Sequence, residues 1–235
     1  SVIICQGASA LIHGNNETVA GVYSQTFILG TGCDSTSNVT LNVNLLPAVD
    51  AGLAQTICFG SNVTLAGSGA TSYVWNNGVT NGTPFSPAVG SLNYTVTGTD
   101  GNGCVNTDVV NVTVNPLPTA TISGTASVCQ NGTNPTLTFT GAAGTAPYTF
   151  TYNINGGAAQ TVTSVGNTAT VSAPSTTVGT FAYNLVSVQD ASSTACVQAQ
   201  VGSALVTINA LPVVNAGNDL SICDGSTAVL TASGA

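Results

Sequence analysis

Alternation of apolar and polar residues is the dominant pattern along this chain. It is clearest in three segments in which every second residue is apolar, at positions 39–44, 110–115 and 204–209. A period of two is typical of a strand with one buried face. A Leu-Pro pair follows each segment, and proline cannot donate to a strand ladder. We therefore expect each segment to be the last strand of a domain.

Shorter alternating runs occupy much of the remaining chain, and turns rich in Asn and Gly separate them. The runs are 63–65, 73–75, 94–96, 137–139, 148–152, 168–171 and 181–185, and the turns include 76–78, 100–103 and 155–157. No stretch has a convincing helical period. Many short strands joined by such turns predict an all-β chain of small β-sandwiches.

An internal echo divides the chain into repeats. Residues 46–70 return as residues 211–235 at a constant offset of 165, with 13 of 25 positions identical. Such self-similarity indicates a tandem array. With the Leu-Pro pairs at Leu46, Leu117 and Leu211 as boundaries, it predicts domains at 1–45, 46–116, 117–210 and 211–235. We expect the array to be incomplete at both ends.

The seven cysteines keep the same register. An early cysteine follows each Leu-Pro leucine by 12 residues, and a late cysteine precedes it by 13, 13 and 15 residues. Nearest-neighbour pairing gives every repeat the same topology, although seven cysteines allow many other pairings. The bridges expected on this basis are Cys5–Cys33, Cys58–Cys104 and Cys129–Cys196, with the partner of Cys223 beyond Ala235. Disulfides of this kind stabilise small domains and form in an oxidising compartment.

Composition narrows the set of partners. The chain contains no Lys or Arg, only 3% of its residues are charged, and its formal charge is −8. Nothing can therefore neutralise nucleic-acid phosphates or anionic lipid headgroups. No apolar run reaches the 18 or more residues of a membrane helix, so direct membrane insertion is not expected. An apolar fraction of 43% nevertheless predicts folded cores rather than disorder.

Residues of the second repeat carry a family resemblance. They include Val49–Gly52, Gly60–Leu65, Tyr73–Trp75, Tyr94–Asp100, Gly103-Cys104 and Val112–Val114. This string resembles a PKD or Ig-like repeat, residues 1–45 resemble a shorter repeat found beside it, and residues 117–210 resemble another PKD-like type. Such arrays are similar to the giant surface adhesins of gliding bacteria, which the type IX secretion route exports. In that group Asp34-Ser35-Thr36 resembles an O-glycosylation motif, with Ser35 as the acceptor.

Catalytic and metal-binding groups are sparse. The eight carboxylates are scattered in turns and at strand ends, and the single His13 has no partner at catalytic or metal-ligand spacing. We therefore expect no enzyme activity and a surface position for His13. Residues 100–103 and 215–219 are candidate calcium loops, but ordinary Asx turns explain them better, and no cofactor is expected.

These observations favour a structural stalk or spacer in an extracellular adhesin or surface filament that serves attachment or surface motility. The expected partners are neighbouring repeats, a surface polysaccharide or laterally packed copies. One alternative is a carbohydrate-binding module in which Trp75 and Tyr73 stack on sugar, although the pattern favours Trp75 as a core residue. The other is an accessory region of a secreted hydrolase.

Overall fold

The computed structural model describes residues 1–30, 32–232 and 234. The described residues contain only strands, turns and irregular segments and no helix. No helix that is long and apolar enough to cross a membrane occurs in this part of the chain. The fold is therefore all-β, as the alternating pattern predicts, and it divides into two compact units, Ser1–Asn115 and Pro116–Ala235.

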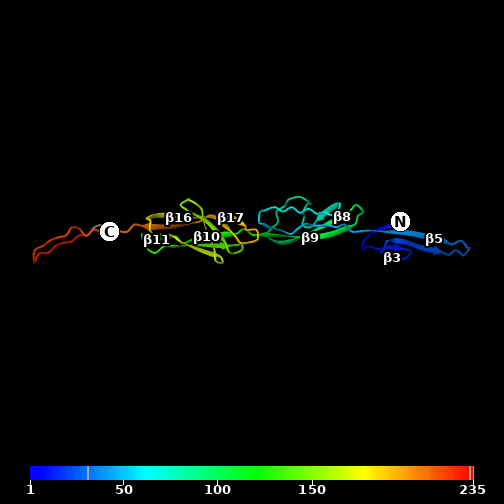
Figure 1. The fold of residues 1–235 in the computed structure, drawn as a ribbon, viewed down its shortest axis with the longest axis horizontal. Helices are drawn as coiled ribbons and strands as arrows, with labels where there is room; N and C mark the ends of the chain where they lie inside the picture. The colour runs from blue at the N-terminus through cyan, green and yellow to red at the C-terminus, as the bar shows by residue number, and fades with distance from the viewer. Residues whose placement is uncertain (31, 233, 235) are drawn as a thin grey trace. The chain divides into compact units, whose positions relative to one another are not determined.

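Unit 1 contains three sheets. Its strands are β1 (Val2–Cys5), β2 (Ala10–Ile12), β3 (Asn15–Glu17), β4 (Gly21–Phe27), β5 (Ser35–Asn44), β6 (Gln55–Cys58), β7 (Ser72–Trp75), β8 (Gly90–Thr99) and β9 (Val105–Asn115). The sheet orders are β1-β5-β4, β2-β3 and β6-β9-β8-β7. The two long strands β8 and β9 lie side by side in Figure 1 and form a ten-residue antiparallel ladder.

The first and last strands of each large sheet in unit 1 pair in parallel. Strand β1 pairs with the end of β5, with Cys5 opposite Asn44, and β6 pairs with the end of β9, with Cys58 opposite Asn115. Both early cysteines therefore lie beside the last residue of a final strand. The sequence pattern identified the final strands but not this parallel partner.

The cores of unit 1 differ greatly in size. Among the described residues of 1–45, only Ile12 and Leu41 are buried apolar side chains. The sheet β6-β9-β8-β7 instead covers a nine-residue cluster that consists of Ala51, Val63, Leu65, Trp75, Tyr94, Val96, Val110, Val112 and Val114. A segment with two buried apolar side chains gains little to offset its conformational entropy, so residues 1–45 depend on neighbouring structure.

The layer that faces this four-stranded sheet is largely irregular. Residues 63–65 alternate as a strand would, yet Val63 makes only an isolated bridge to Phe85, and Asp50 makes another to Ser68. Val63 and Leu65 are both 1% exposed. The alternation therefore predicted burial correctly, whereas the prediction of a regular strand at 63–65 is wrong, because Val63 and Phe85 form an isolated bridge rather than a continuous ladder.

Unit 2 is a sandwich of two sheets. Its strands are β10 (Thr119–Ser123), β11 (Ala126–Cys129), β12 (Thr136–Ala142), β13 (Thr149–Ile154), β14 (Gln160–Thr163), β15 (Thr168–Ser172), β16 (Gly179–Gln189), β17 (Val197–Ala199) and β18 (Ser203–Asn209). One sheet has the order β10-β12-β15, and the other has β11-β18-β16-β13-β14 with β17 on β16. Phe139 of the first sheet stacks on Phe150 of the second at 5.6 Å between ring centroids. Strand β11 is again parallel to the last strand, β18, and Cys129 lies opposite Asn209.

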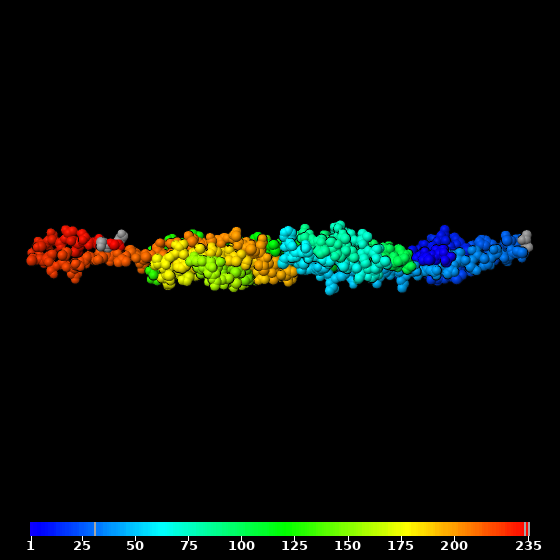
Figure 2. All heavy atoms as spheres, turned by 90° about the horizontal axis from the view of Figure 1, so that it is seen from above, coloured from blue at the N-terminus to red at the C-terminus, as the bar shows by residue number. Residues whose placement is uncertain are grey.

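Residues 211–232 of unit 2 form no strand, and each of their described side chains is exposed (orange to red in Figure 2). Local conformation nevertheless follows the first copy: the Asn215 side chain accepts the Gly217 amide at 2.8 Å, as Asp50 accepts the Gly52 amide at 2.8 Å. In the first copy β6 pairs with β9, and the second copy has no counterpart of β9 within the chain. Turn chemistry is therefore local, whereas strand formation needs a partner. The four-repeat division itself stays a prediction.

One glycine of the echo has a steric reason. Gly69 has φ +85°, and a Cβ there would lie 1.8 Å from the Ala48 carbonyl oxygen; Gly234 has φ +96°, and a Cβ would lie 2.0 Å from the Val213 oxygen. We expect Gly69→Ala to lower the free energy of unfolding by about 3 kcal/mol, because it combines a left-handed backbone with a backbone clash. Urea titration followed by Trp75 emission measures this.

The matched control for that substitution is Gly78→Ala. Gly78 also has a positive φ, +73°, but a Cβ there meets nothing within 4 Å. It should cost only about 1 kcal/mol. Equal midpoints for the two variants would contradict the proposed clash.

Candidate functional site

A disulfide joins the sheet β1-β5-β4 of unit 1 to the start of strand β9, which belongs to the sheet β6-β9-β8-β7 of the same unit. Cys5 and Cys104 are bonded, with their Cα atoms 5.5 Å apart, across a sequence separation of 99 residues. Cys5 ends β1, and Cys104 directly precedes β9. Cys104 is fully buried. We call this bridge and the side chains around it the junction; its members are Cys5, Pro47, Asp100, Cys104, Asn106 and Asp108.

A tight turn holds the late cysteine in place. The Asp100 carboxylate accepts the backbone amides of Asn102 and Cys104, each at 2.8 Å, and the Cys104 carbonyl accepts the Asp100 amide at 3.0 Å. Asp190 stands in a similar relation to Cys196, whose carbonyl accepts the Asp190 amide at 3.0 Å. The turn at 100–103, considered above as a calcium loop, therefore directs a carboxylate oxygen to its own backbone.

Two side chains of β9 hydrogen-bond to residues 47–51, the segment that leads into the sheet β6-β9-β8-β7. The Asn106 side-chain amide donates to the Pro47 carbonyl at 2.9 Å, and the Asp108 carboxylate accepts the Ala51 amide at 2.7 Å. Hydrogen bonds from the Ala51 amide and then the Val109 amide hold the pKa of the Asp108 carboxyl below its usual value. Sequence reasoning missed both contacts, because Asn106 and Asp108 lie more than 50 residues from their partners.

The intra-repeat pairing expected from the sequence is wrong. Cys5 is bonded to Cys104, which excludes both Cys5–Cys33 and Cys58–Cys104. The reason is geometric: Cys5 lies at the last residue of β5, and Cys33 precedes its first residue. Ten strand residues separate these ends by about 30 Å, whereas bridged Cα atoms lie within about 7 Å. Cys58 and Cys104 stand in the same relation to the two ends of β9.

The third expected bridge, Cys129–Cys196, is wrong for a similar reason. Cys129 lies near Ile208, which pairs with Gly179 at the first residue of β16. Cys196 directly precedes β17, whose first residue pairs with Gln189 at the last residue of β16. The two cysteines therefore lie at opposite ends of β16. The disulfide-bonded cysteines are Cys5, Cys58, Cys104 and Cys196. Within the described part of the chain, the free and exposed cysteines are Cys33, Cys129 and Cys223. Whether Cys223 has a partner beyond Ala235 stays a prediction.

The remaining expected site residues lie apart from the junction. Ser35 is exposed at the first position of β5, so its proposed glycosylation stays a prediction. His13 is half-buried in the turn between β2 and β3, where its Nε2 lies 3.3 Å from the Tyr23 carbonyl oxygen. Within residues 1–30, 32–232 and 234, no three His, Cys, Asp or Glu side chains are close enough to hold a metal ion.

The aromatic residues suggested for sugar stacking serve the fold instead. Trp75 is 5% exposed, and its indole N–H donates to the Asn81 side-chain oxygen at 2.9 Å. The Tyr73 hydroxyl donates to the Ala70 carbonyl at 2.6 Å and accepts the Ala70 amide at 2.7 Å. The interpretation of Trp75 as a core residue is therefore correct.

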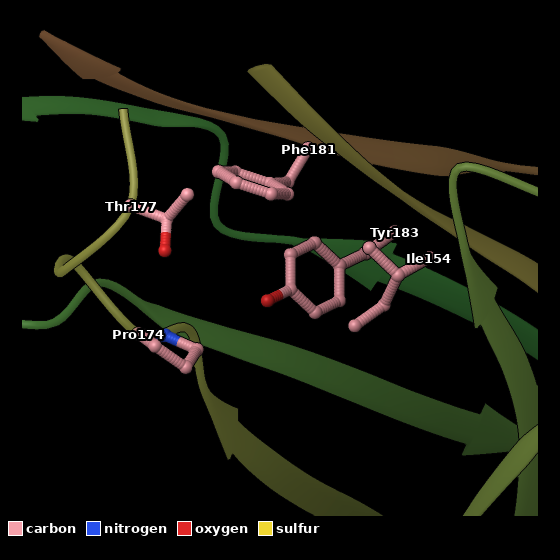
Figure 3. A pocket seen from close by; sticks show the side chains of 5 residues that line it. All are labelled: Ile154, Pro174, Thr177, Phe181 and Tyr183. Carbon is pink, nitrogen blue, oxygen red and sulfur yellow. The ribbon is translucent and has the colours of Figure 1, made fainter. Parts of the chain in front are cut away.

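Unit 2 carries a shallow depression of about 240 Å³. Figure 3 shows Phe181 and Tyr183 projecting into it with Thr177, Pro174 and Ile154. Tyr183 is 3% exposed, and burial, followed by the nearby Tyr152, raises the pKa of its phenol. Its lining is mostly apolar and carries no ionisable group other than this neutral phenol, so the depression offers contact surface but no reactive group.

Comparisons with known proteins describe the architecture only. No family model matches the chain, and no curated protein matches it. The N-terminal eight Ig domains of the Down syndrome cell adhesion molecule are 16% identical, with 86% of this chain and 37% of that one covered at a TM-score of 0.45. An adhesin with which an Antarctic bacterium binds ice is 15% identical, with coverages of 83% and 60% and a TM-score of 0.36. An I-band fragment of titin is 8% identical, with coverages of 90% and 95% and a TM-score of 0.41.

The chain thus spans 37% and 60% of the first two of these structures. All three neighbours are built from Ig-like or adhesin domains. Their low identities and TM-scores identify neither a family nor a function for this chain.

Cysteine mapping tests the junction directly. We expect iodoacetamide to modify Cys33, Cys129 and Cys223 in the unreduced protein and all seven cysteines after unfolding and reduction. Chymotryptic peptides of the unreduced protein should contain Cys5 linked to Cys104. A Cys5–Cys33 peptide, or full modification of Cys5 before reduction, would contradict the structure.

The single tryptophan provides a second test. The Asn81 side-chain oxygen accepts both the Trp75 indole N–H and the Gly67 amide. We expect Asn81→Ala to reduce the free energy of unfolding by about 1–2 kcal/mol, because a buried indole donor loses its partner. Denaturant titration followed by Trp75 emission measures this. Asn81→Asp keeps an acceptor at the same place and should cost less; an equal loss would show that the hydrogen bond contributes little.

Proposed function

We propose that this chain is a structural spacer segment of an extracellular, repetitive adhesin or surface filament that serves attachment or surface motility. The observation that carries the proposal is the Cys5–Cys104 bridge, which covalently joins the sheet β1-β5-β4 to the start of β9 in the sheet β6-β9-β8-β7. A bond at this position fixes successive sheets in series without forming a binding cleft. Disulfides of this kind also belong to an oxidising environment, which supports an extracellular location.

The chemistry of the surface supports the same role. A chain without Lys or Arg offers trypsin no cleavage site in either the folded or the unfolded state, and it binds polyanions poorly. Its exposed strand edges also lack the lysines that usually discourage edge-to-edge pairing. Lateral packing of copies or glycans at positions such as Ser35 would protect these edges, and both belong to the proposal.

The proposal also includes a source and an export route. Because the repeats resemble the PKD and Ig-like repeats of giant adhesins, we propose that the chain belongs to a gliding bacterium and is exported by the type IX route. The domain limits 1–45, 46–116, 117–210 and 211–235 form part of it. A non-catalytic role is likewise proposed, because the Asp100 and Asp108 carboxylates accept backbone amides of a turn and of the junction. The carbohydrate-binding alternative loses its main support, since Trp75 is buried.

A reach assay tests the spacer role. The only primary amine of this chain is the α-amino group of Ser1, because it contains no lysine, so an amine-reactive linker attaches it to beads by that end. A short epitope peptide follows Ala235, and antibody is fixed beneath a polyethylene glycol brush. We expect capture of beads at brush thicknesses at which beads that carry the epitope directly are not captured.

Two outcomes of this assay oppose the proposal. Equal capture of both kinds of bead would show that the chain adds no reach. Retention of epitope-free, chain-coated beads on cellulose, chitin or agarose would favour a carbohydrate-binding module instead. Beads coated with the urea-unfolded, reduced and alkylated chain are the control for folded structure.

A further inference from the structure

The Cys5–Cys104 bridge runs from one proposed repeat to the next. It joins the early cysteine of the first repeat to the late cysteine of the second. Cys5 stands opposite Asn44, the last residue of β5, and one residue separates Asn44 from the pair Leu46-Pro47. This early cysteine is therefore presented beside the Leu-Pro link through which the chain enters the following repeat.

Cys129 occupies the same place at the end of the third repeat. It stands opposite Asn209, the last residue of β18, and one residue again separates that asparagine from the pair Leu211-Pro212. The carbonyls of Cys5 and Cys129 each accept the amide three residues later, at 3.0 Å in both cases. Cys129 thus has the ladder position, the turn and the link of Cys5, but its thiol is exposed and free.

Late cysteines are held at the Leu-Pro link of their own repeat. Asn106, two residues after the late cysteine of the second repeat, donates its side-chain amide to the Pro47 carbonyl at 2.9 Å. Gln200, four residues after the late cysteine of the third repeat, donates in the same way to the Pro118 carbonyl at 3.4 Å. In both repeats the late cysteine and the start of the repeat are therefore fastened together, and at the second repeat the bridge to Cys5 forms there.

We propose that Cys129 is a covalent attachment site whose partner is the late cysteine of the repeat that begins at Leu211. That partner lies in the hairpin turn before the last strand of its repeat, as Cys104 lies directly before β9. The inference rests on the repeat division given with the proposed function. Its general form is that the early cysteine of one repeat bonds the late cysteine of the next.

Thiol–disulfide exchange forms such a bond. One protein thiolate attacks a small disulfide, such as oxidised glutathione, and releases one thiol; the second protein thiolate then attacks the mixed disulfide and releases the other. Two protein thiols are thereby oxidised, and one small disulfide is reduced to two thiols. The exposed thiol of Cys129 is accessible to this reaction.

The free cysteines fit this rule. Among the described residues they are Cys33, the late cysteine of the first repeat, and Cys129 and Cys223, the early cysteines of the third and fourth. The rule places the partner of each of them in a repeat that lies outside residues 1–235 or is only begun within them. Pairing within the third repeat would instead require Cys129 to reach the opposite end of β16.

A chimeric chain supplies a partner for the test. Residues 1–210 are followed by a second copy of residues 46–115, so that the Leu-Pro link is kept and a complete repeat follows it. All residues of the buried cluster around Trp75 lie within the copied segment, which therefore brings its own core. In the copy, the substitution Asn102→Gln at an exposed turn position gives the peptide of its late cysteine a distinct mass.

The chimera is folded with reduced and oxidised glutathione, alkylated with iodoacetamide and digested without reduction by thermolysin, which cleaves before apolar residues. We expect a peptide pair that joins Cys129 to the marked Cys104 of the copy. Modification of Cys129 should fall about tenfold or more relative to the 235-residue chain, since thiols on adjacent repeats react as an intramolecular pair.

Two substitutions in the copy are the controls. Cys104→Ser removes the proposed partner and should restore full modification of Cys129. Cys58→Ser is the matched change at the early cysteine of the copy and should leave the bridge to Cys129 intact.

Full modification of Cys129 in the chimera would overturn the proposal, and so would a bond from Cys104 of the copy to its own Cys58 or to Cys33. Acrylamide quenching reports whether the tryptophan of each copy is buried, and we expect both to be protected. An accessible tryptophan in the copy would overturn the proposal too, because the repeat that follows this link is required to fold there. The reach assay measures extension rather than pairing, so one of the two hypotheses is able to fail while the other stands.

Discussion

A parallel ladder between the first and last strands of a sheet recurs in three places and governs the rest of the structure. It places Cys5, Cys58 and Cys129 opposite the terminal residues Asn44, Asn115 and Asn209. The next residue then donates its amide to the same asparagine carbonyl at 2.8 Å in all three cases. Because a strand of seven to eleven residues keeps its ends tens of ångströms apart, this register excludes a bridge between the two ends of the same final strand.

The size of the cores explains why such a bond is useful. Unit 2 fills the space between two sheets with a cluster that includes Phe139, Phe150 and Val188, each fully buried. The sheet β1-β5-β4 has no comparable core, and a small segment of this kind is marginal by itself. The covalent bond to the start of β9 links this sheet to the larger cluster around Trp75 within unit 1.

An unusual surface accompanies this architecture. Hydroxyl and amide side chains take the place of charges, as in the partly exposed group formed by Ser91, Asn93, Asn111 and Thr113, which hydrogen-bond to one another across β8 and β9. Cross-strand pairs of this type stabilise a sheet without ionic attraction. They are also insensitive to salt, since no charge is involved. These interactions therefore persist when the salt concentration changes, which is consistent with the proposed spacer role.

The sequence by itself determined the features that depend on neighbouring residues. The period of two predicted the final strands β5, β9 and β18 and their last residues, because side-chain alternation acts locally. Strands β5 and β9 begin four and five residues before the alternating segments 39–44 and 110–115. The buried position of Trp75 followed from the same alternation. Only the tertiary structure decided the partner of Cys5, the irregular layer around Val63 and the contacts of Asn106 and Asp108. Each of these features depends on which distant segments pair. The spacing of cysteines along the sequence assigns them to a repeat, but it does not show at which end of a strand each cysteine lies.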